Sequence, residues 1–167
     1  MQAAPINYFA FGSNLSSKRL LQRLPAAGLG DVAILRHHRL CFHNNAQGES
    51  GKCDIEFTGS HNDDVYGIIY RLTESEKQLL DGYETAGFGY LDKPVKVYTP
   101  DGECIEALTY YAASNEGMHP PYHWYKEHVL RGAIEHGFPA EYIAAIEAVE
   151  SIDDPSPGRA GQELAIY

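Results

Sequence analysis

The feature that most constrains this chain is an aromatic run that ends abruptly in small and polar residues, Tyr8-Phe9-Ala10-Phe11-Gly12-Ser13-Asn14-Leu15. Residues 6–11 are apolar and aromatic, which is typical of a short buried strand. Gly12 can take backbone angles closed to other residues and lets a ligand approach closely. Ser16 is placed to cap the helix that we expect to begin there. The stretch therefore predicts a strand, a loop and a helix start in direct succession.

Such a junction leaves backbone N–H groups without partners inside the helix. They form a natural site for a carboxylate or for a developing oxyanion. The alternative is an ordinary tight turn, because glycines at strand ends are common for purely structural reasons. The stretch alone leaves both interpretations open.

Length and charge limit what this loop can serve. A chain of 167 residues is expected to form one domain with a core large enough to fold without disulfides or a metal. A formal charge of −10 and a pI near 5.1 argue against nucleic acid and against an anionic membrane as partners. No apolar run approaches the ~18–20 residues of a membrane span. Small molecules are the expected ligands.

The cysteines point to a reducing compartment. Cys41, Cys53 and Cys104 are an odd number without a C-x-x-C pair, so neither a disulfide framework nor a zinc knuckle is expected. The N-terminus has no basic region followed by an apolar core. We expect a soluble, unprocessed cytoplasmic protein.

The order of elements along the chain predicts an α+β fold. Residues 1–150 form the expected single domain, and residues 151–167 an irregular tail whose last four residues can return to the body. A capping box at Thr73–Glu76 opens one helix, and Pro100-Asp101-Gly102 turns a hairpin. Strands are predicted at residues 31–42 (one long or two short), 54–58, 65–72, 90–98 and 104–112, helices at 74–83, 122–136 and 139–149, and loops at 25–30 and 44–52.

Glu84 is the candidate catalytic group with the most unusual setting. It follows the predicted helix and lies among apolar, aromatic and glycine residues. Desolvation there would raise its pKa and fit it for proton transfer. A solvent-facing glutamate that closes a helix is the alternative, because most glutamates are surface residues.

Two stretches together resemble the γ-glutamylcyclotransferase family. Residues 8–15 are similar to its Y-F-A-Y-G-S-N-L signature, and Leu80-Asp81-Gly82-Tyr83-Glu84 is similar to its L-D-x-x-E segment. The resemblance continues through Gly87-Phe88-Gly89-Tyr90. It also includes Tyr125-Lys126, Gly132-Ala133 and Gly137-Phe138-Pro139, and so covers about residues 8–150.

The resemblance implies a fold, a reaction and a set of site residues. The fold is a small mixed, mostly antiparallel sheet curled into a barrel with flanking helices. The reaction is attack of a γ-glutamyl substrate's own α-amine on its γ-carbonyl, which releases 5-oxoproline and a free amine as part of glutathione metabolism. It needs no metal or organic cofactor, and the enzyme would be a monomer or homodimer. Glu84 would be the acid/base; the substrate-binding candidates are Tyr8, Phe9, Ala10, Phe11, Gly12, Ser13, Asn14, Tyr90 and Tyr125.

Two positions depart from the family pattern. Phe11 stands where the family usually has tyrosine, and Thr85 replaces the glycine that commonly follows the catalytic glutamate. The wider family acts on different γ-glutamyl compounds with the same core chemistry, so the leaving amine is the part of the substrate that these changes concern.

Three other interpretations remain. The two histidine groups, residues 37, 38, 43 and 119, 123, 128, could bind a transition metal, although their spacings match no ligand motif. Ser13 could be a nucleophile, but it lacks a G-x-S-x-G elbow. A non-catalytic binding module could retain the same fold. For that last alternative, the discriminating observation is whether Glu84 points into a pocket beside Gly12 and Ser13.

Overall fold

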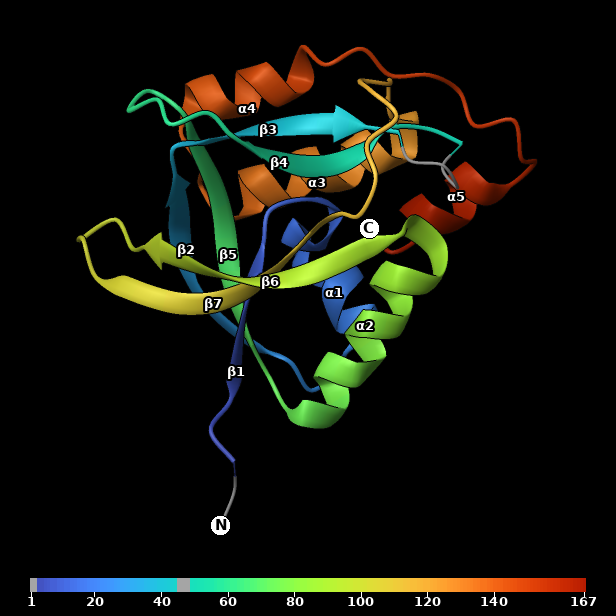
Figure 1. Ribbon diagram of the computed structural model, residues 1–167. Helices are drawn as coiled ribbons and strands as arrows, with labels where there is room; N and C mark the ends of the chain where they lie inside the picture. Colours follow the sequence, from blue (N-terminus) through green and yellow to red (C-terminus); the bar gives the residue numbers. More distant parts are fainter. Residues whose placement is uncertain (1–2, 45–48) are drawn as a thin grey trace.

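The computed structural model describes residues 3–44 and 49–167, apart from the side chains of residues 85–88. At its centre is a closed barrel with strand order β1-β5-β2-β6-β7 (Figure 1). Neighbouring strands are antiparallel, except that β1 and β7 pair in parallel at Tyr8 and Leu108 and close the barrel. The predicted α+β fold with a mixed, mostly antiparallel barrel is confirmed. The strands are β1 (Ile6–Ala10), β2 (Gly28–Arg36), β5 (Asp64–Leu72), β6 (Tyr90–Tyr98) and β7 (Cys104–Ala112).

β5 holds the barrel together because it pairs with β1 on one side and β2 on the other. It is buried along most of its length, as its nearly continuous apolar sequence predicts. Gly67 is required in it, because a Cβ there would lie 2.5 Å from the carbonyl oxygen of Ala10 and from the ring of Phe9. β1 can therefore lie close against β5, which fixes where the loop after β1 begins.

A second, two-stranded sheet lies beside the barrel and consists of β3 (His38–His43) and β4 (Lys52–Phe57). The predicted stretch at residues 31–42 is thus two strands. His37 separates them, with a left-handed φ of 65° that ends one strand and redirects the chain. β2 begins at Gly28, so the loop expected at residues 25–30 is shorter than predicted. In the predicted 44–52 loop, residues 45–48 lie outside the described residues.

The helices lie around these sheets. A short 3₁₀-helix, η1 (Ser13–Leu15), follows β1 and leads into α1 (Ser17–Arg23). α3 (His123–Glu135) packs on η1, and α4 (Ala140–Glu147) lies over the β3–β4 sheet (Figure 1). No helix in the described part of the chain is long and apolar enough to cross a membrane.

α2 (Glu74–Phe88) is longer than the sequence predicts. The capping box of Thr73 and Glu76 opens it as expected, but its C-cap is Gly89, whose left-handed φ of 67° ends the helix. The predicted position of Glu84 at the end of the helix is therefore wrong, because the residue lies inside α2. The side chain of Thr85, which replaces a glycine usual in the family, lies outside the described residues.

The C-terminal segment contains a short helix, α5 (Arg159–Leu164), where the sequence predicts irregular structure. Gly158 has a left-handed φ of 79° at its start, and the Glu163 carboxylate pairs with Arg19 of α1 at 2.6 Å. The predicted return of the last residues is confirmed, since the Tyr167 hydroxyl donates to the Ser16 Oγ at 2.8 Å. This segment is ordered by contacts with residues far away in the sequence, and local sequence patterns do not reveal such contacts. The boundary at residue 150 stays a prediction.

Candidate active site

The loop after β1 is fixed by hydrogen bonds from both sides. The Ser16 Oγ accepts from the Arg19 N–H at 3.4 Å and caps α1. The buried Tyr70 hydroxyl of β5 lies 3.0 Å from the Asn14 carbonyl oxygen. The first N–H groups of a helix such as η1 have no acceptor within that helix. The junction predicted from the sequence is present, with η1 as an unpredicted intermediate turn.

A small cavity lies between this loop, β4, α2 and the barrel. Its volume of about 30 Å³ is enough for about one or two water molecules. Glu84 lies in its wall together with Gly12 and Ser13, the arrangement expected from the sequence for an acid/base site. The described residues that line the cavity are Tyr8, Phe11, Gly12, Ser13, Asn14, Cys53, Glu84, Tyr90, Tyr110 and Tyr125.

Asn14 holds the Glu84 carboxylate in place. Its Nδ2 donates to Glu84 Oε1 at 3.0 Å and to the Tyr8 hydroxyl oxygen at 3.1 Å, and all three side chains are buried. The Arg23 Nη1 lies 3.5 Å from Asn14 Oδ1, which orients the amide with its nitrogen toward the carboxylate. Because an amide donor favours the ionised carboxyl, Asn14 both positions Glu84 and stabilises its charge.

Glu84 is a carboxyl group whose proton affinity is poised near neutrality. Burial raises its pKa from 4.5 to about 7. The positive charges of Arg23 and Arg19, and the hydrogen bond from Asn14, act in the opposite direction and keep the pKa from rising further. A carboxyl that gains and loses its proton near neutral pH suits general acid/base catalysis.

Two tyrosine hydroxyls bond to the backbone of Cys53. The Cys53 N–H donates to the Tyr125 hydroxyl oxygen at 2.9 Å, and the Tyr90 hydroxyl donates to the Cys53 carbonyl at 2.6 Å. Burial raises the pKa of the Cys53 thiol to about 12, so this thiol stays protonated. The backbone of Cys53 in β4 thus fixes both tyrosines beside the Gly12–Asn14 loop.

The structure brings most of the predicted site residues together, with two exceptions. Phe9 and Ala10 are buried but are not among the described residues that line the cavity. Phe9 packs against Gly67 in the barrel. Alternation along β1 turns the Phe9 side chain to the face opposite that of Tyr8, which lines the cavity.

Cys53 and Tyr110 line the cavity and were not predicted. Tyr110 lies on β7, where its hydroxyl donates to Asp81 Oδ1 at 2.6 Å. Cys53 comes from β4. No local pattern marks either residue, because strands distant in sequence bring them to the loop. Asp81 of the L-D-x-x-E segment is the one signal in the sequence, because an aspartate there could have indicated a partner such as the Tyr110 hydroxyl.

The two histidine groups serve separate local contacts. His43 Nδ1 lies 2.9 Å from Asp54 Oδ2, and the buried His128 lies between Tyr167 and Glu163. His123 is paired with Asp153 at 3.0 Å. Among residues 3–44 and 49–167, no group of three or more histidine, cysteine or acidic side chains is arranged to hold a metal ion.

The barrel, the loop and the buried Glu84 carboxylate in the cavity wall define a class of small barrel proteins with a carboxylate beside the loop that follows the first strand. Comparison with known proteins narrows that class. The model of the AIG2-like family matches residues 64–146. The human γ-glutamylcyclotransferase is 33% identical over 165 residues, which cover 94% of this chain and 84% of the human protein. The mouse protein of the same name is 34% identical over 151 residues, which cover 86% of this chain and 78% of the mouse protein.

A solved structure of a γ-glutamyl cyclotransferase superposes with a TM-score of 0.84 at 30% identity, covering 97% of this chain and 98% of that one. The chain belongs to the γ-glutamylcyclotransferase family. The resemblance in the sequence motifs is thereby confirmed over nearly the whole chain.

Proposed function

We propose that this protein is a γ-glutamylcyclotransferase that converts a small γ-glutamyl compound into 5-oxoproline and a free amine or amino acid. The observation that carries the proposal is Glu84, a buried carboxyl with a pKa of about 7 in the cavity formed by Gly12, Ser13 and Asn14. Membership of the family supports the same reaction.

The reaction needs a base because the substrate's α-amine is an ammonium ion without a lone pair at neutral pH. Glu84 takes that proton, and the amine nitrogen then forms a bond to the γ-carbonyl carbon. As the carbonyl re-forms, the bond from this carbon to the leaving nitrogen breaks. Glu84 returns the proton to that nitrogen as the bond breaks. The new ring nitrogen still carries two hydrogens and gives one of them, through Glu84, to the released amine. The products are a neutral lactam and an ammonium ion, and Glu84 ends in its starting state.

The remaining residues bind and orient the substrate in this proposal. N–H groups of the Gly12–Asn14 loop receive the α-carboxylate or the charge that develops on the carbonyl oxygen. The Tyr125 hydroxyl contacts the substrate. Tyr90 helps to hold Tyr125 in place, because both hydroxyls bond to the backbone of Cys53. Because the nucleophile belongs to the substrate, the main task of the protein is to hold it in a ring-closing geometry.

The cavity around Glu84 is partly open to solvent, and the space within its walls is small. Its volume of about 30 Å³ accommodates water but not a γ-glutamyl group. Aromatic and polar side chains form most of the wall, so changes of rotamer can open it. Phe11, where the family usually has tyrosine, removes one hydroxyl from this wall and so bears on which leaving amine is accepted.

The setting of the enzyme belongs to the same proposal. Cys41, Cys53 and Cys104 are free thiols, which supports a reducing compartment such as the cytoplasm. The substrates there would be γ-glutamyl compounds that connect with glutathione metabolism.

The test is a screen of γ-glutamyl amino acids, γ-glutamyl amines and intact glutathione for 5-oxoproline release. We expect at least one simple γ-glutamyl compound to be cyclised, with glutathione a poor substrate. Release of glutamate would indicate hydrolysis by water instead of ring closure. Absence of either product across the screen would favour the non-catalytic alternative.

A further inference from the structure

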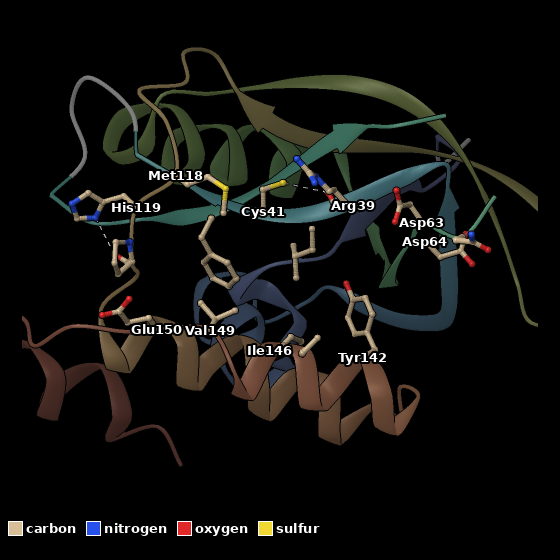
Figure 2. Close-up of a pocket in the computed structure, with 15 residues that line it drawn as sticks. Arg39, Cys41, Asp63, Asp64, Met118, His119, Tyr142, Ile146, Val149 and Glu150 are labelled. Carbon is tan, nitrogen blue, oxygen red and sulfur yellow. Dashed lines mark hydrogen bonds between the residues drawn. The ribbon is translucent and has the colours of Figure 1, made fainter. Parts of the chain in front are cut away.

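A second and larger cavity lies away from Glu84, between the β3–β4 sheet and α4 (Figure 2). Its volume is about 540 Å³, within the range of ~300–1,000 Å³ that is usual for small-molecule sites. It shares no lining residue with the cavity around Glu84.

The walls of this cavity are apolar. Side chains from the sheet lie over side chains from α4, and Met118 lies beside Cys41 on the side of the sheet (Figure 2). Met118 is 76% exposed, so a thioether that could be buried by a ligand faces solvent. The main apolar lining residues are Leu40, Phe42, Met118, Tyr142, Ile146 and Val149.

The ends of the cavity are acidic. Asp63 and Asp64 lie at one end, and Glu150 lies at the other beside His119 (Figure 2). Within the described part of the chain, none of these three carboxylates lies within ion-pair distance of a basic side chain. Arg39, the guanidinium on the edge, is already paired with Glu56 at 2.6 Å. The charge available to a ligand is therefore negative.

From this combination we infer that the cavity is a second ligand site, which takes an organic ammonium ion with an apolar body. The hydrocarbon part replaces water along Phe42, Ile146 and Val149, which is favourable in proportion to the apolar area covered. The ammonium group lies against the carboxylates at one or both ends, where it needs no other counter-ion. An anion of the same shape would meet these carboxylates with repulsion.

The site goes beyond the proposed reaction and is separate from its machinery. One link with the cavity around Glu84 is Phe42, whose ring meets that of Tyr125 edge-on with the centroids 6.5 Å apart. An occupant of the second cavity would thus contact the back of a wall whose front faces the candidate active site.

The experiment is isothermal titration of the whole protein with 2-phenylethylamine, and with 2-phenylethanol and 3-phenylpropanoate as neutral and anionic analogues of similar shape. We expect saturable binding of one equivalent of the amine, weaker binding of the alcohol and none of the acid. In Ala145→Trp, which fills the cavity from α4, amine affinity should fall at least about tenfold, or ~1.4 kcal/mol.

Matched variants locate the effect. Ala144→Trp places the same ring at the next exposed position of α4, outside the cavity lining, and should bind the amine like the parent protein. A variant without the three carboxylates combines Asp63→Asn, Asp64→Asn and Glu150→Gln. Its affinity for the amine should fall by about two- to fivefold for each carboxylate that the ammonium touches. Glu147→Gln, outside the cavity lining, should have no effect. Glu84→Gln should keep full amine binding, which separates this site from the proposed reaction.

Three results would overturn the inference. The first is equal amine binding by Ala145→Trp and Ala144→Trp. The second is binding of the alcohol or the acid as tight as that of the amine. The third is a dimer of the parent protein in sedimentation equilibrium that is lost in Ala145→Trp and kept in Ala144→Trp. A second copy of the chain would then be the occupant of this cavity.

Discussion

At Glu84, burial and charge act in opposite directions on one carboxyl group. Burial favours the protonated form, whereas Arg23, Arg19 and the hydrogen bond from Asn14 favour the ionised form. The balance leaves a pKa of about 7. A lone surface glutamate would stay near its usual value and would be a poor acid at neutral pH. The environment of this residue, more than its identity, is what suits it to move a proton in both directions.

Asn14→Ala should move the proton affinity of Glu84 in a known direction. Loss of the amide donor removes a bond that lowers the pKa of Glu84, so the acid limb of kcat/KM should shift to higher pH. A hydrogen bond to a charged group is worth about 1.5–3 kcal/mol, which sets roughly one to two pH units as the upper bound. pH–rate profiles of this variant and of the exposed control Asn62→Ala measure the shift. An unmoved limb in Asn14→Ala would mean that the amide does not act on Glu84.

Glu84→Gln should stabilise the fold above neutral pH. Because the folded-state pKa is raised from 4.5 to about 7, the native state holds its proton more tightly than the unfolded state. Stability of the parent protein therefore falls as pH rises from about 4.5 to 7. The full penalty, on the order of 3 kcal/mol, is present only above that window.

Urea unfolding at pH 8 and pH 4 measures this difference. The glutamine variant should be the more stable protein at pH 8, and its advantage should vanish near pH 4. Glu147→Gln, at an exposed position of α4, is the control and should match the parent at both values. A glutamine variant that is less stable than the parent at pH 8 would show that the carboxylate is well compensated in the fold.

At the scale of elements, the sequence predicted the strands and helices better than their ends. The apolar run of β5, the hairpin of β6 and β7, and the capping box of α2 are local patterns, and each element formed where expected. The predicted end of α2 was wrong. The residue that takes the left-handed conformation is Gly89, and Gly82 and Gly87 are equally plausible from the sequence. α5 could not be predicted, since its order comes from contacts with α1 and α3.

The candidate site divides in the same way. Glu84 and the Gly12–Asn14 loop were found from motifs, whereas Tyr110 and Cys53 reach the cavity only through the pairing of distant strands. Tyr110 reaches it from β7, which closes the barrel against β1. Phe9 was placed in the site because it belongs to the motif, but its ring packs against Gly67. A motif thus reports which segment forms a site and not which of its faces does so.

The contact between α3 and η1 sets the position of the Gly12–Asn14 loop. A Cβ at Gly132 of α3 would lie 2.3 Å from the Leu15 Cβ and 2.6 Å from the Ser16 nitrogen. Gly132→Ala should therefore push α3 from η1, with a loss of about 1–3 kcal/mol in the free energy of unfolding. Turnover should fall as well, because η1 contains Asn14.

Gly82→Ala is the matched control on another helix. A Cβ at Gly82 of α2 has nothing within 4 Å, so alanine should stabilise the protein by about 0.5–1 kcal/mol through its helix propensity. Thermal unfolding and turnover of both variants measure these effects. If Gly132→Ala were as stable and active as Gly82→Ala, the close approach of α3 to η1 would not be needed.

At the scale of the whole molecule, the C-terminal segment supports α1, the helix that follows the Gly12–Asn14 loop. Glu163 of α5 lies 2.6 Å from Arg19 Nη1 and 3.2 Å from His128 Nε2. Arg19 is almost fully buried on α1, so its charge needs this carboxylate. The hydrogen bond from His128 and the charge of Arg19 lower the pKa of Glu163 to about 2. The chain thus closes on itself around the start of α1.

Glu163→Gln should destabilise the protein by about 1–3 kcal/mol at neutral pH, because it leaves a buried guanidinium without its counter-charge. Since the pKa of Glu163 is depressed, its contribution is complete above about pH 4.5 and is lost as pH falls toward 2. Glu127→Gln, which removes the exposed pair with Arg131, should cost at most about 0.5 kcal/mol. Equal unfolding midpoints for the two variants in urea would contradict this account of the C-terminal segment.

The most direct test of the central claim is the turnover of Glu84→Gln on the γ-glutamyl compound that releases the most 5-oxoproline. Glutamine keeps the shape of the side chain and its bond from Asn14 but cannot take up a proton. A positioned acid/base is typically worth about 10²–10⁴-fold, so kcat should fall by at least that lower factor while substrate binding, measured by titration, stays nearly unchanged. The acid limb near pH 7 should be absent from any residual activity. A variant that turns over at close to the parent rate would contradict the assignment of Glu84 as the group that moves the proton.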